Sequence, residues 1–350
     1  MSFGYNVPMS EKSVTVGFSG GKDSTASIIL LKEKGYKVSA LTMKLGLNGE
    51  DEKIVKVKEL AGILNVPHKI IDLRSEFQDR VISYFINSYK EGITPNPCVM
   101  CNNRVKFELL MDFGIKNMGS SFFATGHYAD KIEIDGKHFL TEPVEKKKSQ
   151  IYFLSMIGEE KLKRVLFPLA SIPIDKVREI VKDLPLGNKN ESQDVCFLNG
   201  HQLADYLKEH IPEAFKKGDI LNISGEKIGQ HNGSANFTIG QRRGTNFPSD
   251  GKLYVVKKNV SENTLTLGKE EDLYSDGFEI EKPVMWKEIK EKDHYKARIR
   301  YMSRFEDVVI KNVSRDSITA EFLSPVKSVT SGQAGVFFQN NIIVASGFIK

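Results

Sequence analysis

A glycine-rich loop joins the first apolar segment of the chain to the first helical pattern. Residues 14–18 are typical of a buried strand, residues 17–24 spell Gly-Phe-Ser-Gly-Gly-Lys-Asp-Ser, and residues 25–34 have helical spacing. Consecutive glycines let backbone N–H groups approach an anion closely, and the start of a helix adds a positive dipole. Because doubly wound α/β folds bind phosphate at such a strand-to-helix turn, the loop predicts this fold for the N-terminal part.

The segments that follow repeat the alternation of strand and helix. This alternation predicts parallel βαβ units in a Rossmann-like, doubly wound sheet. The apolar runs are residues 38–43, 68–73 and 122–125, and the helical pattern is residues 52–64. Ser75 and Gln78 have the spacing of a capping box, which predicts a helix that begins at this pair.

The second half of the chain changes character. A helical pattern at residues 174–181 begins after Pro173, and short alternating runs separated by Gly, Asn and Ser dominate from about residue 218. We expect small β modules there, with strands at residues 252–256, 264–267, 297–301, 317–322 and 336–338. A chain of 350 residues exceeds one ordinary core. We therefore expect a catalytic domain at residues 1–208, a small central domain at 209–272 and a β-barrel at 273–350.

Composition excludes a few classes of protein. The sequence has no apolar run of membrane-spanning length and no secretory pattern at its start, so we expect a cytoplasmic protein without a membrane partner. The 50 basic residues exceed the 45 acidic ones by only five, so any contact with nucleic acid must come from local basic clusters.

The loop differs from the phosphate loop of kinases and GTPases. Val16 and Asp23 occupy the first and last positions of that pattern, which requires Gly and Ser or Thr there. Ser-Gly-Gly-x-Asp-Ser instead resembles the loop of enzymes that split ATP into AMP and pyrophosphate, in which the aspartate helps to hold Mg²⁺. A glycine-rich turn that binds no nucleotide is the plainer alternative.

The three cysteines are Cys98, Cys101 and Cys196. An odd number of thiols in a reducing compartment favours catalytic, metal-binding or buried roles over disulfides at rest. Cys98 and Cys101 follow a rigid Thr-Pro-Asn-Pro segment at the start of a helical pattern. A helix N-terminus stabilises thiolate, which is the nucleophilic form of cysteine, so we expect Cys101 to ionise readily.

Five motifs together resemble those of the bacterial tRNA-specific 2-thiouridylases, and they occur in the family's order. The resemblance extends over residues 13–350 and implies an N-terminal ATP pyrophosphatase domain, a small central domain and a C-terminal β-barrel that contacts tRNA. The motifs are Thr-Pro-Asn-Pro-Cys-x-x-Cys-Asn at 94–102, Ala-Thr-Gly-His-Tyr at 124–128, Ser-Gln-Asp-Val-Cys-Phe at 192–197, Phe-Thr-Ile-Gly-Gln-Arg-Arg-Gly at 237–244 and Ser-Gly-Gln-Ala-Gly-Val-Phe-Phe at 331–338.

The resemblance also implies roles for individual residues. Cys101 would be the nucleophile, Cys196 would carry a persulfide and Asp23 would serve ATP and Mg²⁺. The implied ATP contacts are Gly17, Phe18, Ser19, Gly20, Gly21, Lys22, Asp23, Ser24, Met43 and Gly126. Asn96, Pro97 and Cys98 would flank the target base, and the implied tRNA contacts are Lys148, Ser149, Gln150, Arg300 and Tyr301.

The reaction implied is ATP-dependent replacement of the C2 oxygen of the wobble uridine by sulfur. The C2 carbonyl is a poor electrophile, so its oxygen is first adenylated with release of pyrophosphate, after which sulfur displaces AMP. The implied partners are tRNA with Lys, Glu or Gln acceptors and a sulfur-carrier protein or cysteine desulfurase that loads Cys196.

Several alternatives stay open from the sequence. Cys98, Cys101 and Cys196 are also suited to ligating an iron–sulfur cluster, and Cys98 with Cys101 makes a zinc half-site without a second pair of ligands. Other enzymes with this loop form amides or thiolate cytidine, and a non-catalytic RNA-binding module would need no ATP turnover. Met43 and Gly126 are equally suited to packing, and His127 receives no catalytic role.

Overall fold

The computed structural model describes residues 12–186, 195–198, 200–242 and 251–350. The chain forms two compact units. The first unit comprises Met1–Arg80, Cys98–Phe197 and Asn341–Ile343, and the second comprises Val81–Pro97, Leu198–Asn340 and Val344–Lys350. Within the described residues, no helix is both long enough and apolar enough to cross a bilayer.

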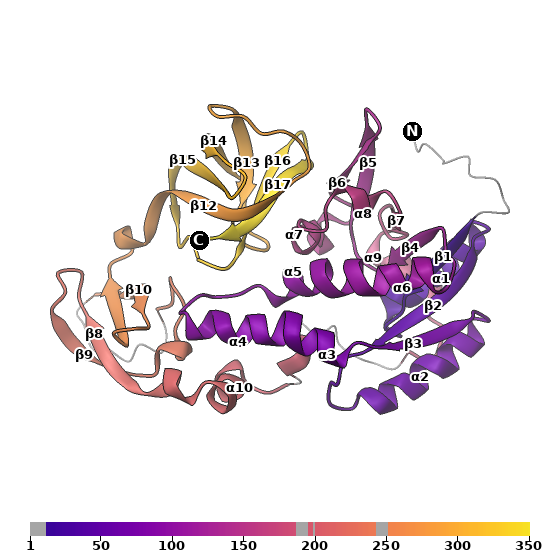
Figure 1. Ribbon diagram of the computed structural model, residues 1–350, viewed down its shortest axis with the longest axis horizontal. Coiled ribbons are helices and arrows are strands. Elements are labelled where there is room, and N and C mark those ends of the chain that lie inside the picture. The colour runs from indigo at the N-terminus through magenta and orange to yellow at the C-terminus, as the bar shows by residue number, and fades with distance from the viewer. Residues whose placement is uncertain (1–11, 187–194, 199, 243–250) are drawn as a thin grey trace. The chain divides into compact units, whose positions relative to one another are not determined.

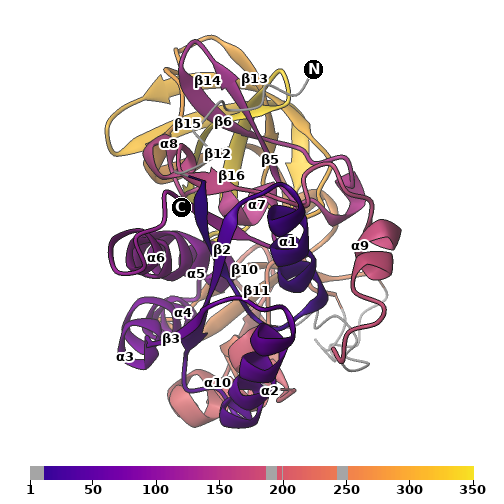
Figure 2. The same ribbon diagram turned by 90° about the vertical axis from the view of Figure 1, so that its right-hand side faces the viewer.

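The first unit contains a parallel sheet with the strand order β3-β2-β1-β4-β7. The order runs outward from β1 in both directions, which is the mark of a doubly wound sheet, so the predicted fold class is confirmed. The strands, labelled in Figure 1, are β1 (Ser13–Gly17), β2 (Lys37–Lys44), β3 (His68–Asp72), β4 (Phe122–Thr125) and β7 (Val165–Leu166), and Figure 2 shows β2 and β3 from the side.

Successive side chains of each strand point to opposite faces of this sheet, and helices cover both faces. Val14 and Val16 of β1 lie in one core cluster with residues of α1 (Lys22–Glu33) and α2 (Glu50–Ile63). Thr15 points to the other face, where a Cβ on Gly114 would come within 3.0 Å of its side chain. The loop after β1 therefore lies where the strand order reverses, which is the ligand-binding edge of this fold.

Shorter elements complete the first unit. They are α3 (Arg74–Phe77), α5 (Pro97–Cys101), the π-helix η3 (Asn102–Leu110), α6 (Met111–Lys116), β5 (Asp130–Ile134), β6 (Lys137–Thr141), the 3₁₀ turn Lys146–Lys148, α7 (Ile151–Leu154), α8 (Glu159–Leu162), α9 (Ile174–Ile180) and the 3₁₀ turn Cys196–Leu198 that continues into the second unit.

The predicted capping box at Ser75 and Gln78 is wrong. The helix α3 begins one residue earlier, at Arg74, and its N-cap Leu73 makes no side-chain cap hydrogen bond. Instead the Asp72 carboxylate accepts the Arg74 backbone N–H at 3.2 Å. A carboxylate two residues upstream thus satisfies the first donor of the helix, and Ser75 lies inside it.

The second unit contains two β modules and the helices α4 (Ser83–Lys90) and α10 (Leu203–His210). The central module is a sheet in the order β10-β11-β8-β9, and the C-terminal module is a barrel in the order β12-β15-β14-β13-β16-β17, closed by pairing of β12 with β17. The strands are β8 (Lys217–Leu221), β9 (Lys227–Asn232), β10 (Tyr254–Asn259), β11 (Thr264–Gly268), β12 (Tyr274–Met285), β13 (His294–Arg298), β14 (Glu306–Val313), β15 (Ser317–Lys327), β16 (Ala334–Gln339) and β17 (Ile342–Ile349).

The strand predicted at residues 297–301 ends early. The strand β13 stops at Arg298, and Arg300 and Tyr301 lie in the turn that follows it. Tyr301 is 40% exposed there, so its ring is not part of the barrel core.

The barrel holds the Thr-Pro-Asn-Pro segment within the second unit. The Thr94 N–H donates to the Ser331 carbonyl at 3.1 Å. The Gln333 side-chain amide donates to the carbonyls of Thr94 at 3.0 Å and of Pro95 at 3.4 Å. Gly332 has a φ of +87°, and a Cβ there would lie 2.8 Å from the Thr94 carbonyl oxygen. The segment that leads into the cysteine helix is therefore fixed by residues more than 200 positions away.

Replacement of Gln333 by Ala should loosen this segment. Removal of the side-chain amide weakens the contact by about 1 kcal/mol, so amide exchange in residues 91–97 should become roughly fivefold faster. Hydrogen-exchange mass spectrometry measures this directly. Gln339→Ala is the control, because that side chain accepts a hydrogen bond from Lys287 at an exposed position of the same barrel. Unchanged exchange in Gln333→Ala would contradict the assignment.

Candidate functional site

A cavity of about 260 Å³ lies at the carboxyl ends of β1, β2 and β4 in the first unit. Its position is the one that the strand order predicts for a phosphate-containing ligand. Several predicted ATP contacts line it: Gly17, Phe18, Ser19, Asp23, Ser24, Met43 and Gly126. Gly20, Gly21 and Lys22 belong to the same loop but are not among the lining residues.

The loop after β1 is shaped by glycine conformation and by two serines. Gly20 has a φ of +72°, and a Cβ there would lie 2.6 Å from Val57 of α2, so only glycine fits. The Ser24 hydroxyl lies 3.2 Å from the Ser19 hydroxyl and donates to the Gly21 carbonyl at 3.0 Å. The Ser19 backbone N–H donates to the Ser24 hydroxyl oxygen at 3.3 Å. Ser24 thus closes the loop onto the first turn of α1.

Gly126, just after β4, lies directly against this loop. A Cβ at Gly126 would lie 2.7 Å from the Asp23 carbonyl carbon and 2.7 Å from the Ser24 nitrogen. Both are backbone atoms, which cannot rotate away as a flexible side chain can. The glycine therefore permits a close approach of two backbones, in addition to lining the cavity.

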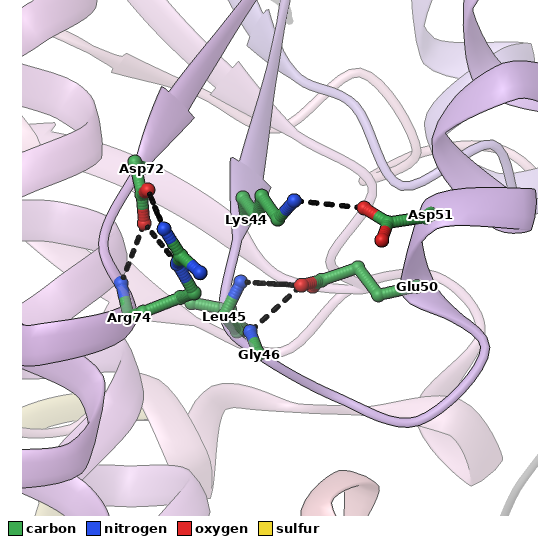
Figure 3. Close-up of polar contacts among 7 residues, drawn as sticks. All are labelled: Lys44, Leu45, Gly46, Glu50, Asp51, Asp72 and Arg74. Atoms are coloured by element: carbon green, nitrogen blue, oxygen red, sulfur yellow. Dashed lines mark hydrogen bonds and ion pairs between the residues drawn. The ribbon is translucent and has the colours of Figure 1, made fainter.

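The loop between β2 and α2 forms another wall of the cavity and is shown in Figure 3. The Glu50 side chain is 9% exposed, and its carboxylate accepts the N–H groups of Leu45 at 2.8 and 3.0 Å and of Gly46 at 2.7 Å. On the β3 side, Arg74 makes a bidentate ion pair with Asp72, and a Cβ on Gly46 would touch the Arg74 stem at 3.4 Å. The loop is therefore held from both sides.

Charge pairing fixes the neighbouring residues of this wall. Hydrogen bonds from Arg74 lower the pKa of Asp72 to about 2. A hydrogen bond from Lys44 at 2.7 Å lowers the pKa of Asp51, so both carboxylates stay charged at neutral pH. Met43, next to the last residue of β2, lines the cavity, and these ion pairs hold the chain on either side of it.

Two lysines and one histidine also line the cavity. Lys53 comes from α2 and Lys106 from η3, so cationic groups from two elements face a site built for an anion. The Nδ1 atom of His127 and the Oγ1 atom of Thr125 are hydrogen-bonded at 2.8 Å. Burial, with Lys106 adding to it, holds the pKa of His127 well below its usual range, so the ring is neutral at pH 7.

The three thiols are free and lie within electrostatic range of one another in the first unit. Burial is the largest effect on each and raises the pKa of all three thiols, that of Cys101 to about 11. Lys106 opposes this rise at each thiol, whereas the Cys196 charge adds to it at Cys98 and at Cys101. The expectation that Cys101 ionises readily is therefore wrong, because Cys101 is the last residue of α5 rather than part of its first turn, and burial raises its pKa.

The thiols do not form a ready-made metal site. Across the described ranges, no three His, Cys, Asp or Glu side chains converge well enough to hold a metal ion, although all three cysteines are described.

Comparisons with known proteins agree over the whole chain. Family models match residues 12–200 (tRNA methyl transferase HUP domain), 204–269 (tRNA methyl transferase PRC-barrel domain) and 275–349 (aminomethyltransferase β-barrel domain). The tRNA-specific 2-thiouridylase MnmA 2 of Thermoanaerobacter sp. strain X514 is 34% identical over 96% of this chain and 97% of its own length. The tRNA-specific 2-thiouridylase MnmA of Clostridioides difficile strain 630 is 34% identical over 97% of this chain and 98% of its own length. That of Treponema denticola is 35% identical over 96% of this chain and 97% of its own length.

The chain belongs to the tRNA-specific 2-thiouridylase family. Its N-terminal HUP domain, central PRC-barrel domain and closed C-terminal barrel are the three parts of that family's fold, as predicted.

The residues that the 2-thiouridylase resemblance implies for tRNA lie in different environments. Ser149 is 4% exposed, and Gln150 lines the cavity and is hydrogen-bonded to Tyr128. Arg300 and Tyr301 are exposed in their turn. Asn96 is 7% exposed and Pro97 is buried, whereas Cys98 is exposed. Ser192, Gln193 and Asp194 of the Cys196 motif, and Arg243, lie outside the described residues.

Three residues of this 2-thiouridylase site were not predicted from the sequence. Glu50 and Lys53 are charged residues in an ordinary amphipathic helix, so nothing in the pattern marks them. Lys106 lies five positions after Cys101, which in an α-helix is roughly 140° around the axis. The π-helix η3, with its i→i+5 hydrogen bonding, brings residues five apart closer to one face. No pattern in the sequence predicts a π-helix at residues 102–110.

Replacement of Gly126 by Ala should impair the nucleotide site in this 2-thiouridylase. The added Cβ cannot fit 2.7 Å from two backbone atoms, so the phosphate loop must shift. Such a displacement should slow pyrophosphate release roughly 100-fold. Gly62→Ala in α2 is the control, because a Cβ there meets nothing within 4 Å. A Gly126→Ala enzyme with normal affinity for Mg·ATP and a normal rate would contradict the close-approach argument.

The reactivity of Cys101 should report its raised pKa. Thiolate is the reactive form, so alkylation of Cys101 by iodoacetamide should accelerate roughly tenfold per pH unit from pH 7 to 10. At pH 8 it should be about 100-fold slower than in urea-unfolded protein, where the pKa is ordinary. Mass spectrometry of the Cys101 peptide follows both rates. A plateau below pH 9.5 in the folded protein would show that burial does not govern this thiol.

Proposed function

We propose that this protein replaces the C2 oxygen of the wobble uridine of tRNA with sulfur, using ATP. The observation that carries the proposal is the position of Lys106. Its side chain lines the nucleotide cavity and also acts electrostatically on Cys98, Cys101 and Cys196. A phosphate-binding loop and a cluster of thiols thus share one cationic group, as a reaction that joins nucleotide activation to sulfur transfer requires. The names of the full-length relatives support the same reaction.

The first step activates the base. Residues 17–24 would hold the phosphates of ATP in the cavity, and Asp23 would help to hold the Mg²⁺ that offsets their charge. The uridine C2 oxygen attacks the α-phosphorus, the bond from that phosphorus to the bridging oxygen breaks, and pyrophosphate leaves. Lys53 and Lys106 face this charge from two elements and stabilise it. The product is a base whose C2 carries AMP as a leaving group.

The second step transfers sulfur. The terminal sulfur of a Cys196 persulfide attacks C2, and AMP departs with the former carbonyl oxygen. The Cys101 thiolate then attacks the inner sulfur of Cys196, which releases the thiocarbonyl and leaves a Cys101–Cys196 disulfide. In the equivalent route, Cys101 first releases sulfide from Cys196, and the sulfide attacks C2. An external dithiol reduces the disulfide in either case.

The raised pKa of Cys101 suits this order of events. A thiol with a pKa of about 11 is mostly protonated at neutral pH and does not attack the persulfide prematurely. Its proton must be removed when the adenylated base is in place. Cys98 is exposed beside it and, with Asn96 and Pro97, is assigned to the surroundings of the target base.

The partners and boundaries complete the proposal. Lys148, Ser149 and Gln150 of the first unit and Arg300 and Tyr301 of the second contact tRNA whose acceptors are Lys, Glu or Gln, and a sulfur-carrier protein or cysteine desulfurase loads Cys196. Arginine and lysine suit phosphate, and an exposed tyrosine suits stacking on a base. We assign residues 1–208 to catalysis, 209–272 to the central domain and 273–350 to the tRNA-contacting barrel, in a cytoplasmic enzyme.

Three substitutions test the roles. Cys101→Ser and Cys196→Ser should each abolish 2-thiouridine formation, whereas Asp23→Asn should slow tRNA-dependent pyrophosphate release by about 100-fold. Mass spectrometry of digested tRNA measures the product, and filter binding should show tRNA affinity within about twofold of the parent protein. Cys98→Ser separates the mechanisms, because it should leave persulfide loading of Cys196 intact. An anaerobically purified protein with an iron–sulfur absorption band that all three Cys→Ser variants lose would overturn the persulfide route.

A further inference from the structure

Tyr128 connects two parts of the first unit that have separate roles. Its hydroxyl donates to the Asp23 carboxylate at 3.3 Å. Its backbone N–H donates to the Gln150 side-chain oxygen at 2.9 Å, and its carbonyl accepts the Gln150 backbone N–H at 2.8 Å. One residue therefore contacts the phosphate loop through its side chain and residue 150 through its backbone.

The ring of Tyr128 is held in the core. The residue is 3% exposed and packs in a cluster with Ala26 and Leu30 of α1 and with Val177 of α9. Ala26 follows Asp23 by less than one turn of the same helix. Because the ring packs against α1 and its hydroxyl bonds to Asp23 in the first turn of that helix, a movement of the Tyr128 backbone is passed on to α1 and the phosphate loop.

The other end of the connection begins at a basic surface. Lys146 and Lys147 are exposed on the 3₁₀ turn Lys146–Lys148, two residues before Gln150. Three consecutive lysines suit a polyanion such as the phosphate backbone of RNA. Between them and Gln150 lies Ser149, whose hydroxyl is buried and has no hydrogen-bond partner among the described residues. A buried hydroxyl without a partner is unfavourable, so a rearrangement of this segment that paired it would gain free energy.

Gln150 belongs to the nucleotide site as well. It lines the cavity together with Asp23 and Ser24. A shift of residues 146–150 on binding a polyanion would therefore be passed from Gln150 through Tyr128 to Asp23.

We propose that Tyr128 is a positioning residue that couples polyanion binding at residues 146–150 to the placement of Asp23 in the phosphate loop. The inference rests on the proposed function, in which the polyanion is tRNA and the loop holds Mg·ATP. Coupling of this kind is reciprocal, so tRNA tightens Mg·ATP binding by the same factor as Mg·ATP tightens tRNA binding. The loop then reaches its productive arrangement only when the acceptor is present.

The experiment measures this factor in the full-length protein. The dissociation constant of the α,β-methylene analogue of ATP, with Mg²⁺, is determined by calorimetry with and without an unmodified tRNA transcript that has uridine at the wobble position. We expect tRNA to tighten nucleotide binding by about 5- to 150-fold in the parent protein. Tyr128→Phe, which removes only the hydroxyl, should reduce the factor to within about twofold of one. Tyr36→Phe is the matched control, because this half-buried ring contacts Phe122 at the opposite edge of the same sheet.

A second variant tests the other end of the connection. Gln150→Ala removes the side-chain oxygen that accepts the Tyr128 N–H and should lower the same factor. The double variant should lower it no further than Tyr128→Phe alone, because both act in one chain of contacts. If Tyr128→Phe does not fold, the factor in Gln150→Ala decides alone.

The outcomes separate this inference from the proposed function. A coupling factor that Tyr128→Phe leaves at the parental value overturns the inference, even if both separate affinities fall, because that pattern indicates a purely structural role. A parent protein that forms 2-thiouridine but shows no coupling also overturns it and leaves the proposed function standing. A parent protein that binds both ligands without tRNA-dependent release of pyrophosphate from ATP defeats the proposed function itself.

Discussion

The close approach of the β4 end to the phosphate loop is the constraint on which the site depends. Gly126 leaves no room for a Cβ between itself and the backbone of Asp23 and Ser24. This contact fixes where α1 begins relative to the adjacent strand, and Tyr128 follows two residues later with its hydroxyl on Asp23. Loop, cavity and tyrosine are therefore arranged by one backbone contact at the point where the strand order reverses.

The electrostatics of the thiols follow from a competition between burial and a single cation. Burial penalises thiolate, and Lys106 favours it at all three sulfurs. Burial prevails at Cys101, so this thiol is mostly protonated at neutral pH, whereas Cys98 and Cys196 are exposed. The reactivity of Cys101 therefore depends on a change in its surroundings that lowers its pKa. In the proposed reaction, that change is the arrival of an adenylated base.

The sequence allowed prediction of the features that depend on local rules. The strand, glycine loop and helix at residues 13–33 predicted the doubly wound sheet, and alternating apolar runs predicted the β modules. The two failures have different physical causes. Asp72, only two residues before Arg74, satisfies the first helical donor in place of Ser75, so a local alternative to the capping box prevailed. Burial reversed the expected ionisation of Cys101, and burial depends on surroundings built by distant parts of the chain.

Residues of the candidate site were missed because no sequence pattern shows which polar groups will meet. Glu50 is important because its carboxylate turns back to the loop at Leu45 and Gly46, and Tyr128 because three contacts converge on it. Periodicity shows which side of a helix is apolar but not which polar group it will meet. The motif resemblance assigned roles to Asp23, Cys101 and Cys196, but it assigned none to Glu50 or Lys106.

The anchoring of Thr94 and Pro95 by Gln333 has a consequence for biosynthesis. Thr94 and Gln333 are 239 residues apart in the sequence. The ribosome therefore makes the cysteine helix long before it makes the barrel strands that follow residue 333. Until residues 331–333 have emerged and folded, the stretch leading to Cys98 lacks its attachment. During synthesis, therefore, the backbone of residues 94–95 stays without its partners until nearly the last strand of the barrel has been made.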